Sequence, residues 1–185
     1  MKNLLIVLVV VIVLASIGGC NTYNRIVQLD EGIDNAWAQV DTVLQRRYDL
    51  IPNLVETVKG YAKHEKELLE EITQLRSQWA EAKGTDEKAQ AATQMEGALG
   101  RLMMVVENYP DLKANQNFLA LQDELAGTEN RISVERRRYN DAVRDYNTAV
   151  RRFPGNLLAR QFGFQKRDAY FEAAEAATLA PKVQF

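Results

Sequence analysis

The sequence predicts an all-α protein, an antiparallel up-and-down four-helix bundle with long helices, preceded by an N-terminal hydrophobic anchor or signal segment. Three observations predict this fold. Only four prolines and ten glycines occur in 185 residues, so long uninterrupted segments are expected. Apolar residues recur at heptad spacing, which is typical of helices packed as in a coiled coil. No stretch shows the sustained alternation that a half-buried strand requires.

Length and composition divide the chain into residues 1–20, a signal or anchor segment, and residues 21–185, a helical domain. With 46% hydrophobic and 26% charged residues, the domain can bury a core and keep a polar surface. A single cysteine excludes an internal disulfide framework and CxxC metal sites. The net charge of −2 gives no general attraction to nucleic acid. We therefore expect no cofactor and no nucleic-acid partner.

The N-terminal apolar run extends from Leu4 to Ile17 and is broken only by Ser16. Its 14 residues would span roughly 21 Å as a helix, whereas a bilayer core is about 30 Å thick. That length fits the apolar region of a signal peptide better than a full membrane span. Short anchors nevertheless exist, because bilayers thin locally.

The run ends at Ile17-Gly18-Gly19-Cys20, which resembles a bacterial lipobox. Cys20 is therefore the predicted lipidation site, and an uncleaved transmembrane anchor is the alternative. We favour a lipoprotein because of the short apolar run. Both alternatives keep Lys2 in the cytoplasm and place the body outside it, in the cell envelope.

The first predicted helix begins near Ile33 and ends at the Lys83-Gly84-Thr85-Asp86 turn. Two heptad series mark its buried face: Ile33, Val40, Arg47, Leu54, Tyr61, Leu68, Leu75, Ala82 and Trp37, Leu44, Ile51, Val58, Glu65, Ile72, Trp79. Pro52 should kink or briefly break this helix, because proline removes one backbone hydrogen bond. Either the helix breaks there or the ends of the longer helices overhang the shorter ones.

Three further helical segments follow, at about residues 86–107, 114–152 and 157–178. Asn108-Tyr109-Pro110-Asp111 separates the first two of these, and Pro154-Gly155-Asn156 separates the last two. Short joints between helices favour antiparallel neighbours.

Three long stretches resemble the LemA family: residues 23–77, which include LIPNLVETVKGYAKHE, residues 107–147, which include ENYPDLKANQNF, and residues 153–173, which include FPGNLLARQFGF. The resemblance covers about residues 23–185. It implies an N-terminal membrane anchor, an extracytoplasmic body and a helical bundle. It implies little about chemistry, because the biochemical role of the family is poorly defined. The lipobox-like end departs from members that have a simple transmembrane anchor.

Arg47, Glu65 and Glu135 occupy heptad positions where apolar residues are expected. A buried charge requires a partner, because an unpaired one costs several kcal/mol. We favour rotation of the apolar face near Pro52, which lets these side chains reach solvent. The alternative is a buried ion pair between Arg47 and a carboxylate, which would set the helix register.

Charge is distributed unevenly along the chain. Residues 26–130 hold 10 Lys/Arg and 19 Asp/Glu, a net of −9, and residues 131–168 hold 10 and 4, a net of +6. We favour an internal origin, in which a basic helix packs beside acidic neighbours. The functional alternative is a membrane or partner surface that combines basic and apolar side chains: Arg151, Arg152, Phe153, Leu157, Leu158, Arg160, Phe162 and Phe164.

Catalytic chemistry finds little support in the sequence. His64-Glu65 begins like HExxH, but position 68 is leucine and His64 is the only histidine. GxSxG, P-loop and GxGxxG motifs are absent. We expect no enzymatic activity and no metal site, and an ordinary structural position for His64.

The sequence therefore predicts a membrane-tethered scaffold or adaptor of the bacterial envelope. Its partners would be envelope proteins, a second copy of the chain or lipid head groups, and no small-molecule substrate is evident. One alternative is an envelope stress sensor that moves at Pro52. A weaker alternative is a hydrolase or metal-dependent enzyme that uses the region of His64.

Overall fold

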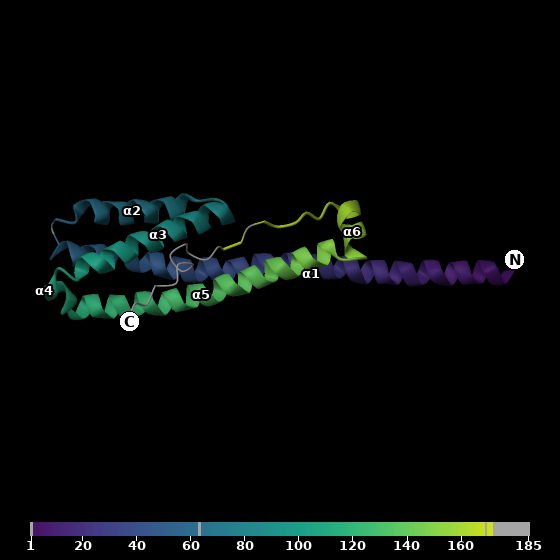
Figure 1. Ribbon diagram of the computed structural model, residues 1–185, viewed down its shortest axis with the longest axis horizontal. Coiled ribbons are helices and arrows are strands. Elements are labelled where there is room, and N and C mark those ends of the chain that lie inside the picture. Colours follow the sequence, from purple (N-terminus) through teal and green to yellow (C-terminus); the bar gives the residue numbers. More distant parts are fainter. Residues whose placement is uncertain (1, 63, 169, 172–185) are drawn as a thin grey trace, which may run out of the picture. The chain divides into compact units, whose positions relative to one another are not determined.

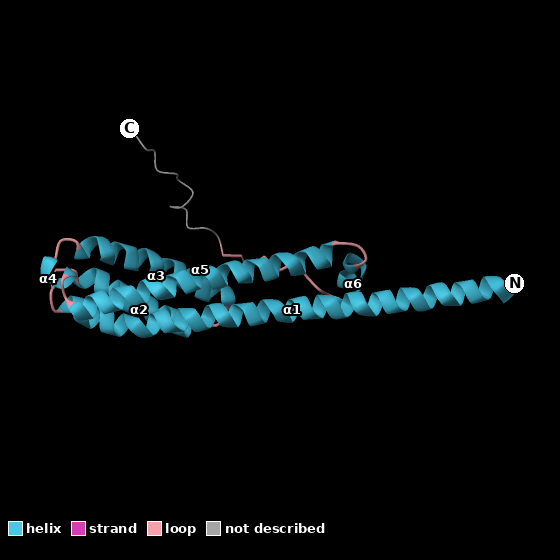
Figure 2. Ribbon diagram, turned by 90° about the horizontal axis from the view of Figure 1, so that it is seen from below, coloured by secondary structure: helices cyan, strands magenta, loops and turns pink. Residues whose placement is uncertain are grey.

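The computed structural model describes residues 2–62, 64–168 and 170–171, and this part of the chain is helical without any strand (Figure 2). The all-α prediction is confirmed. In chain order the helices are as follows (Figure 1): α1 (Lys2–Lys59), α2 (Lys66–Glu81), α3 (Thr85–Val106), α4 (Pro110–Lys113), α5 (Gln116–Arg151) and α6 (Gly155–Phe162).

The chain forms two compact units. Of the described residues, unit one contains 2–38, 137–168 and 170, and unit two contains 39–62, 64–136 and 171. Unit one therefore consists of the beginning of α1, the end of α5 and all of α6, with the segment that follows α6. Unit two takes the end of α1, all of α2, α3 and α4, and the beginning of α5.

Unit two buries the apolar face that the heptad spacing predicts. Most buried residues of its α1 segment and of α2 belong to the two heptad series, and Tyr48, Val55 and Leu69 are buried beside them. The buried apolar members of the series are Val40, Leu44, Ile51, Leu54, Val58, Ile72, Leu75 and Trp79. From α3 and α5 come further core residues, including Met95, Leu99, Leu102, Phe118, Leu125 and Ile132. Each large aliphatic side chain removed from water contributes about 1.5–3 kcal/mol, so this face holds the helices together. α2 and α3 lie side by side within this unit (Figure 1).

The first helical segment breaks after Lys59 and not at Pro52, which corrects the sequence-based expectation. α1 runs without interruption through Pro52, whose side chain is exposed. The turn begins at Gly60, where both Tyr61 and Ala62 donate to the carbonyl of Val58 at 3.0 and 2.8 Å. Glycine has low helix propensity, so the helix ends there at little cost.

Arg76 explains why the helix survives the proline. A proline at position 52 leaves the carbonyl of residue 48, four residues earlier, without its helical donor. Nε of Arg76 on α2 donates to the carbonyl oxygen of Tyr48 at 3.2 Å. A side chain from the neighbouring helix therefore replaces the missing backbone hydrogen bond.

The limits of α3 and α5 lie within two residues of those predicted. The joint between them contains the short helix α4, where Pro110 stands at the first turn and lacks only a donor that would be unpaired anyway. At the start of α5, the backbone N–H of Phe118 donates to Oδ1 of Asn115 at 3.1 Å. This contact satisfies one of the free donors of the first turn.

Unit one packs the end of α5 and α6 against the first half of α1. Its core contains the following buried side chains: Ile26, Ile33, Tyr139, Val143, Tyr146, Val150 and Ala159. The rings of Trp37 and Tyr139 meet edge to face, with centroids 5.6 Å apart. Such aromatic pairs add about 0.5–1.5 kcal/mol beyond their buried area.

Helix α6 ends much earlier than residue 178. Gly163 follows it with φ 78°, a left-handed conformation that glycine adopts without strain. The N–H of Phe164 then donates to the carbonyl of Ala159 at 3.0 Å, which completes a Schellman-type end. Residues 164–168 are not helical, and the predicted end at Ala180-Pro181 lies outside the described residues.

The apolar run lies at the start of α1, and the helix continues through Cys20 and the rest of the unit-one segment without a break. The large apolar side chains of residues 4–10, 12–14 and 17 are 50–79% exposed. Among the described helices, only α1 has a stretch that is long and apolar enough to cross a membrane, judged by length and composition. A signal sequence meets the same criterion.

Candidate functional site

Residues 151–164, named here the α6 corner, comprise the end of α5, the following turn and helix α6. The exposed side chains that the sequence singled out here include Arg151, Arg152, Phe153, Leu157, Arg160 and Phe162. Phe153 is 79% exposed, an unusual position for a phenylalanine. Leu158 and Phe164 are half-buried. The α6 corner therefore presents arginines and large apolar groups together.

Tyr23 on α1 holds the α6 corner in place. Its ring lies 4.9 Å from that of Phe162 and 5.7 Å from that of Phe164, measured between centroids. Tyr23 follows the apolar run by six residues, about 9 Å along the helix axis. The sequence analysis did not single out Tyr23, although an aromatic residue soon after an apolar run is a recognisable signal.

Gly155 allows the turn after α5 to close. A Cβ atom at this position would stand 2.2 Å from the carbonyl oxygen of Ala149 and 3.6 Å from Cδ1 of Ile26. The backbone at Gly155 therefore lies directly against α5 and close to α1. Only glycine leaves room for that approach.

The segment after α6 is fastened to α5 by side chains. Asn147 is buried and donates to the carbonyl of Arg167 at 2.7 Å, while the N–H of Arg167 donates back to its Oδ1 at 2.9 Å. The hydroxyl of Tyr146 donates to the carbonyl of Gln165 at 2.9 Å. Burial, and secondarily the nearby Asp30 carboxylate, raise the pKa of Tyr146. Its hydroxyl therefore stays protonated and available to donate.

Arg167 also ties this segment to α1. Its Nη2 lies 3.0 Å from Oδ1 of Asp30, and this hydrogen bond raises the pKa of Arg167. The pair joins a residue of the acidic part of the sequence to one of the basic part. In unit two, Arg136 of the basic part pairs with Glu96 of the acidic part. Ion pairs within the chain therefore neutralise part of the uneven charge. Arg151, Arg152 and Arg160 remain exposed.

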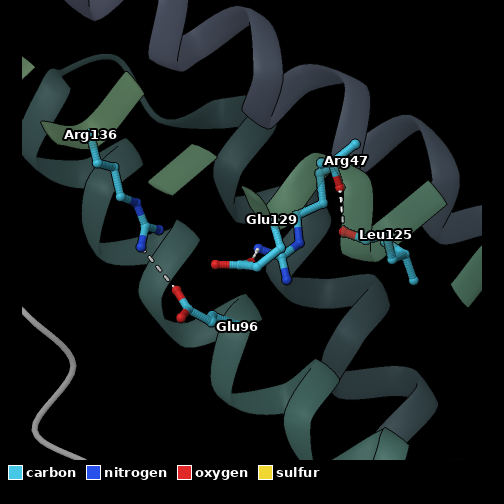
Figure 3. A network of polar contacts seen from close by, with 6 residues as sticks. Arg47, Glu96, Leu125, Glu129 and Arg136 are labelled. Atoms are coloured by element: carbon cyan, nitrogen blue, oxygen red, sulfur yellow. Dashed lines mark hydrogen bonds and ion pairs between the residues drawn. The ribbon is translucent and has the colours of Figure 1, made fainter. Parts of the chain in front are cut away.

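Unit two contains a polar cluster between α1, α3 and α5 (Figure 3). Nη1 of Arg47 lies 2.5 Å from Oε2 of Glu129, and the Arg47 side chain is only 8% exposed. Nη1 of Arg136 lies 3.0 Å from Oε2 of Glu96. Thr128 donates its hydroxyl to the carbonyl of Leu125 at 2.8 Å nearby. Two cations and two carboxylates thus compensate each other inside the unit.

The structure places the three charged heptad residues apart. Arg47 is buried rather than turned to solvent, and it pairs with Glu129. Glu65 lies in the turn before α2 and accepts from the hydroxyl of Tyr109 at 3.1 Å. Glu135 is half-buried on α5. For Arg47 the favoured rotation toward solvent is therefore wrong, and the alternative of a buried ion pair fits, with a partner that the spacing did not indicate.

The remaining candidates form no catalytic arrangement within the described residues. His64 is exposed in the turn between α1 and α2. No three His, Cys, Asp or Glu side chains of the described residues could hold a metal ion together. Cys20 is a free, exposed cysteine on α1.

Comparison with known proteins identifies the family. The LemA family model matches residues 36–185. Magnetosome protein MamQ 2 of Paramagnetospirillum magneticum is 28% identical over 190 aligned residues, which cover 87% of this chain and 70% of the relative. Magnetosome protein MamQ of Magnetospirillum gryphiswaldense is 24% identical, with coverage of 87% and 70%. Protein LemA of Metamycoplasma hominis is 28% identical, with coverage of 82% and 69%. Because the family model matches most of its length, this chain belongs to the LemA family.

Proposed function

We propose that this protein is a membrane-tethered, extracytoplasmic helical bundle that acts as a scaffold or adaptor at the membrane surface. The observation that carries the proposal lies in unit one. Helix α1 leads from an exposed apolar run directly to Tyr23, and the α6 corner packs on Tyr23. The apolar run needs a non-aqueous environment, and the α6 corner stands one to two helical turns beyond it.

The chemistry of the α6 corner suits a lipid surface. Head-group layers extend roughly 5–8 Å beyond each side of the hydrocarbon core, which is the depth that residues just after Ile17 reach. Aromatic rings favour this layer, and arginines attract the anionic head groups there. Phe153, Leu157 and Phe162 supply the apolar part, and Arg151 and Arg160 supply the charge.

Cys20 is proposed as the point of lipid attachment, as its lipobox-like context indicates. Cleavage and lipidation there would place the acyl chains three residues before Tyr23. An uncleaved anchor would place the end of the apolar run six residues before it. The α6 corner is close to the bilayer in both cases. A mass increase of the Cys20→Ser precursor over the wild-type protein would support lipidation, and identical masses would exclude it.

Unit two is proposed to be an antiparallel four-helix arrangement of the end of α1, α2, α3 and the beginning of α5. Ion pairs between these helices support the arrangement: Lys88 with Asp41 at 2.7 Å, Arg101 with Glu71 at 2.5 Å and Arg47 with Glu129. Its paired interior charges and largely polar surface suit binding to another protein better than catalysis.

In-cell photo-crosslinking tests the adaptor role. A photoreactive phenylalanine would replace Met104 on α3, which is 67% exposed, or Leu119 on α5, which is 43% exposed. Repeated capture of the same envelope protein from one position and not from the other would support an adaptor. Crosslinks only between copies of the chain would instead indicate a self-assembling structural element and contradict the adaptor role.

A further inference from the structure

Unit one contains a cavity of about 410 Å³ between α1, the end of α5 and the turn that leads into α6. Arg25 from α1 and Arg152 from the α6 corner line it, with Thr22 and Thr148 beside them. Apolar groups, including Ile26 and Phe153, complete the lining. We name this cavity the arginine cleft.

The side chains of the two cleft arginines have no partner among the described residues, whereas Arg167 and Arg144 of the same unit do. Arg167 pairs with Asp30 and Arg144 pairs with Asp141 at 2.8 Å. Asp145, the carboxylate in the lining, lies 3.6 Å from Nε of Arg144. Neither the Arg25 nor the Arg152 guanidinium group forms an ion pair or hydrogen bond within the described part of the chain. Both are exposed, so an anion can reach their guanidinium groups.

The donors of the cleft match a phosphate group. A guanidinium presents parallel N–H groups that bind phosphate oxygens in pairs. The hydroxyls of Thr22 and Thr148 already donate to the carbonyls of Gly18 and Arg144 at 2.9 and 2.8 Å. Because a phosphate oxygen needs a donor, recognition falls to the two arginines. The apolar lining suits the glycerol and first acyl carbons of a lipid.

We infer that the arginine cleft binds the phosphate of an anionic phospholipid head group. The inference rests on the proposed membrane tether, because Thr22 and Arg25 follow Ile17 by five and eight residues, or about 7.5 and 12 Å along α1. That distance places Thr22 at the outer edge of the head-group layer and Arg25 just beyond it, where a long arginine side chain can reach back to the phosphates. The tether would keep the protein at the bilayer, and the cleft would select the lipid beside it.

Native mass spectrometry of the full chain in detergent, titrated with phosphatidylglycerol, tests this inference. Wild-type protein should retain one phosphatidylglycerol molecule, and Arg25→Gln/Arg152→Gln should weaken this binding on the order of tenfold. The control Arg131→Gln/Arg137→Gln removes two exposed charges on α5 outside both the cleft lining and the α6 corner, and should bind as wild type does. Circular dichroism melts should agree for all three proteins, since the changed side chains are exposed.

Three results would overturn the inference. These are no retention by the wild type, equal retention by the cleft variant, or an equal loss in the control variant. Displacement of the lipid by an equal concentration of inorganic phosphate would reassign the cleft to free phosphate. None of these results bears on the proposed tether, which is tested by crosslinking in cells.

Discussion

Arg76 and Tyr48 are joined by a hydrogen bond that compensates for a third residue, Pro52. Nε of Arg76 donates to the Tyr48 carbonyl at 3.2 Å, and that carbonyl is the one that Pro52 leaves without a helical donor. The ring of Tyr48 also stacks on that of Trp79, with centroids 4.3 Å apart. α2 therefore contacts α1 at the place where Pro52 removes a backbone hydrogen bond from α1.

This relationship predicts a coupling between positions 52 and 76. Arg76→Met should lower the free energy of unfolding by about 1–2 kcal/mol, because the Tyr48 carbonyl loses its donor. In a Pro52→Ala background the alanine N–H supplies the helical bond, so the same change should cost about 1 kcal/mol less. Denaturant unfolding of the four proteins measures the coupling. Equal costs in both backgrounds would show that Arg76 does not compensate for the proline.

The buried hydroxyl of Tyr48 predicts unfolding at alkaline pH. Burial, opposed in part by Arg47, raises the pKa of Tyr48 well above its usual range. The protonated Tyr48 hydroxyl contributes to the free energy of unfolding. This contribution is fully present below the unfolded pKa of about 10 and is lost as the pH rises above that value toward the folded pKa. Tyr48→Phe should reduce this loss of stability between about pH 10 and 12. Melting temperatures across that range give the measurement.

At neutral pH the same variant should be neutral or slightly stabilising. Among the described residues the Tyr48 hydroxyl has no hydrogen-bond partner, so its removal takes away an unpaired buried polar group. Tyr61→Phe is the control, because that hydroxyl accepts from Asn115 at 3.0 Å at an exposed position. Marked destabilisation by Tyr48→Phe at pH 7 would refute this account.

The Arg47–Glu129 pair predicts an asymmetric response to mutation. Glu129→Gln leaves the guanidinium of Arg47, only 8% exposed, without a counter-charge, and should cost about 3 kcal/mol. Arg47→Met should cost less, because the Glu129 side chain is 38% exposed and water can hydrate its carboxylate. Chemical denaturation of both variants measures the order. The reverse order would indicate that Arg47 reaches solvent.

Gly155 predicts a local steric requirement. Gly155→Ala should destabilise unit one by about 1–3 kcal/mol, because its Cβ would stand 2.2 Å from the Ala149 carbonyl oxygen. Gly32→Ala is the matched control within the same unit, since a Cβ there meets nothing within 4 Å. The control should be neutral or stabilising by up to about 1 kcal/mol. Equal thermal melts for the two variants would contradict the packing described here.

The core could be predicted from the sequence because residues three and four positions apart lie on the same face of a helix. Ile33, Val40, Leu44 and Ile51 are buried as their spacing predicts. The break after Lys59 could not be predicted in the same way, because Leu54, Tyr61 and Leu68 continue the heptad spacing across the turn. Pro52 misled the prediction, since its effect depends on Arg76, a residue 24 positions away that the fold brings to it.

The sequence predicted which residues belong to the candidate sites, but it did not predict which residues they contact. Arg47 was identified by its apolar neighbours, but its partner Glu129 lies 82 residues further along the chain. The residues of the α6 corner were identified as a mixture of basic and apolar side chains. Their contact with Tyr23 depends on the Gly155 turn, which brings α6 against α1. Arg25 and Arg152 line one cavity because of that same turn.

The most direct test of the account is lipid photo-crosslinking from the α6 corner in intact cells. A photoreactive phenylalanine would replace Phe153 or, as a control in unit two, Leu119, with the rest of the chain and Cys20 unchanged. If the α6 corner lies at the membrane surface as proposed, phospholipid adducts should form from position 153 and none from position 119. Equal lipid adducts from both positions, or protein adducts only from position 153, would contradict it.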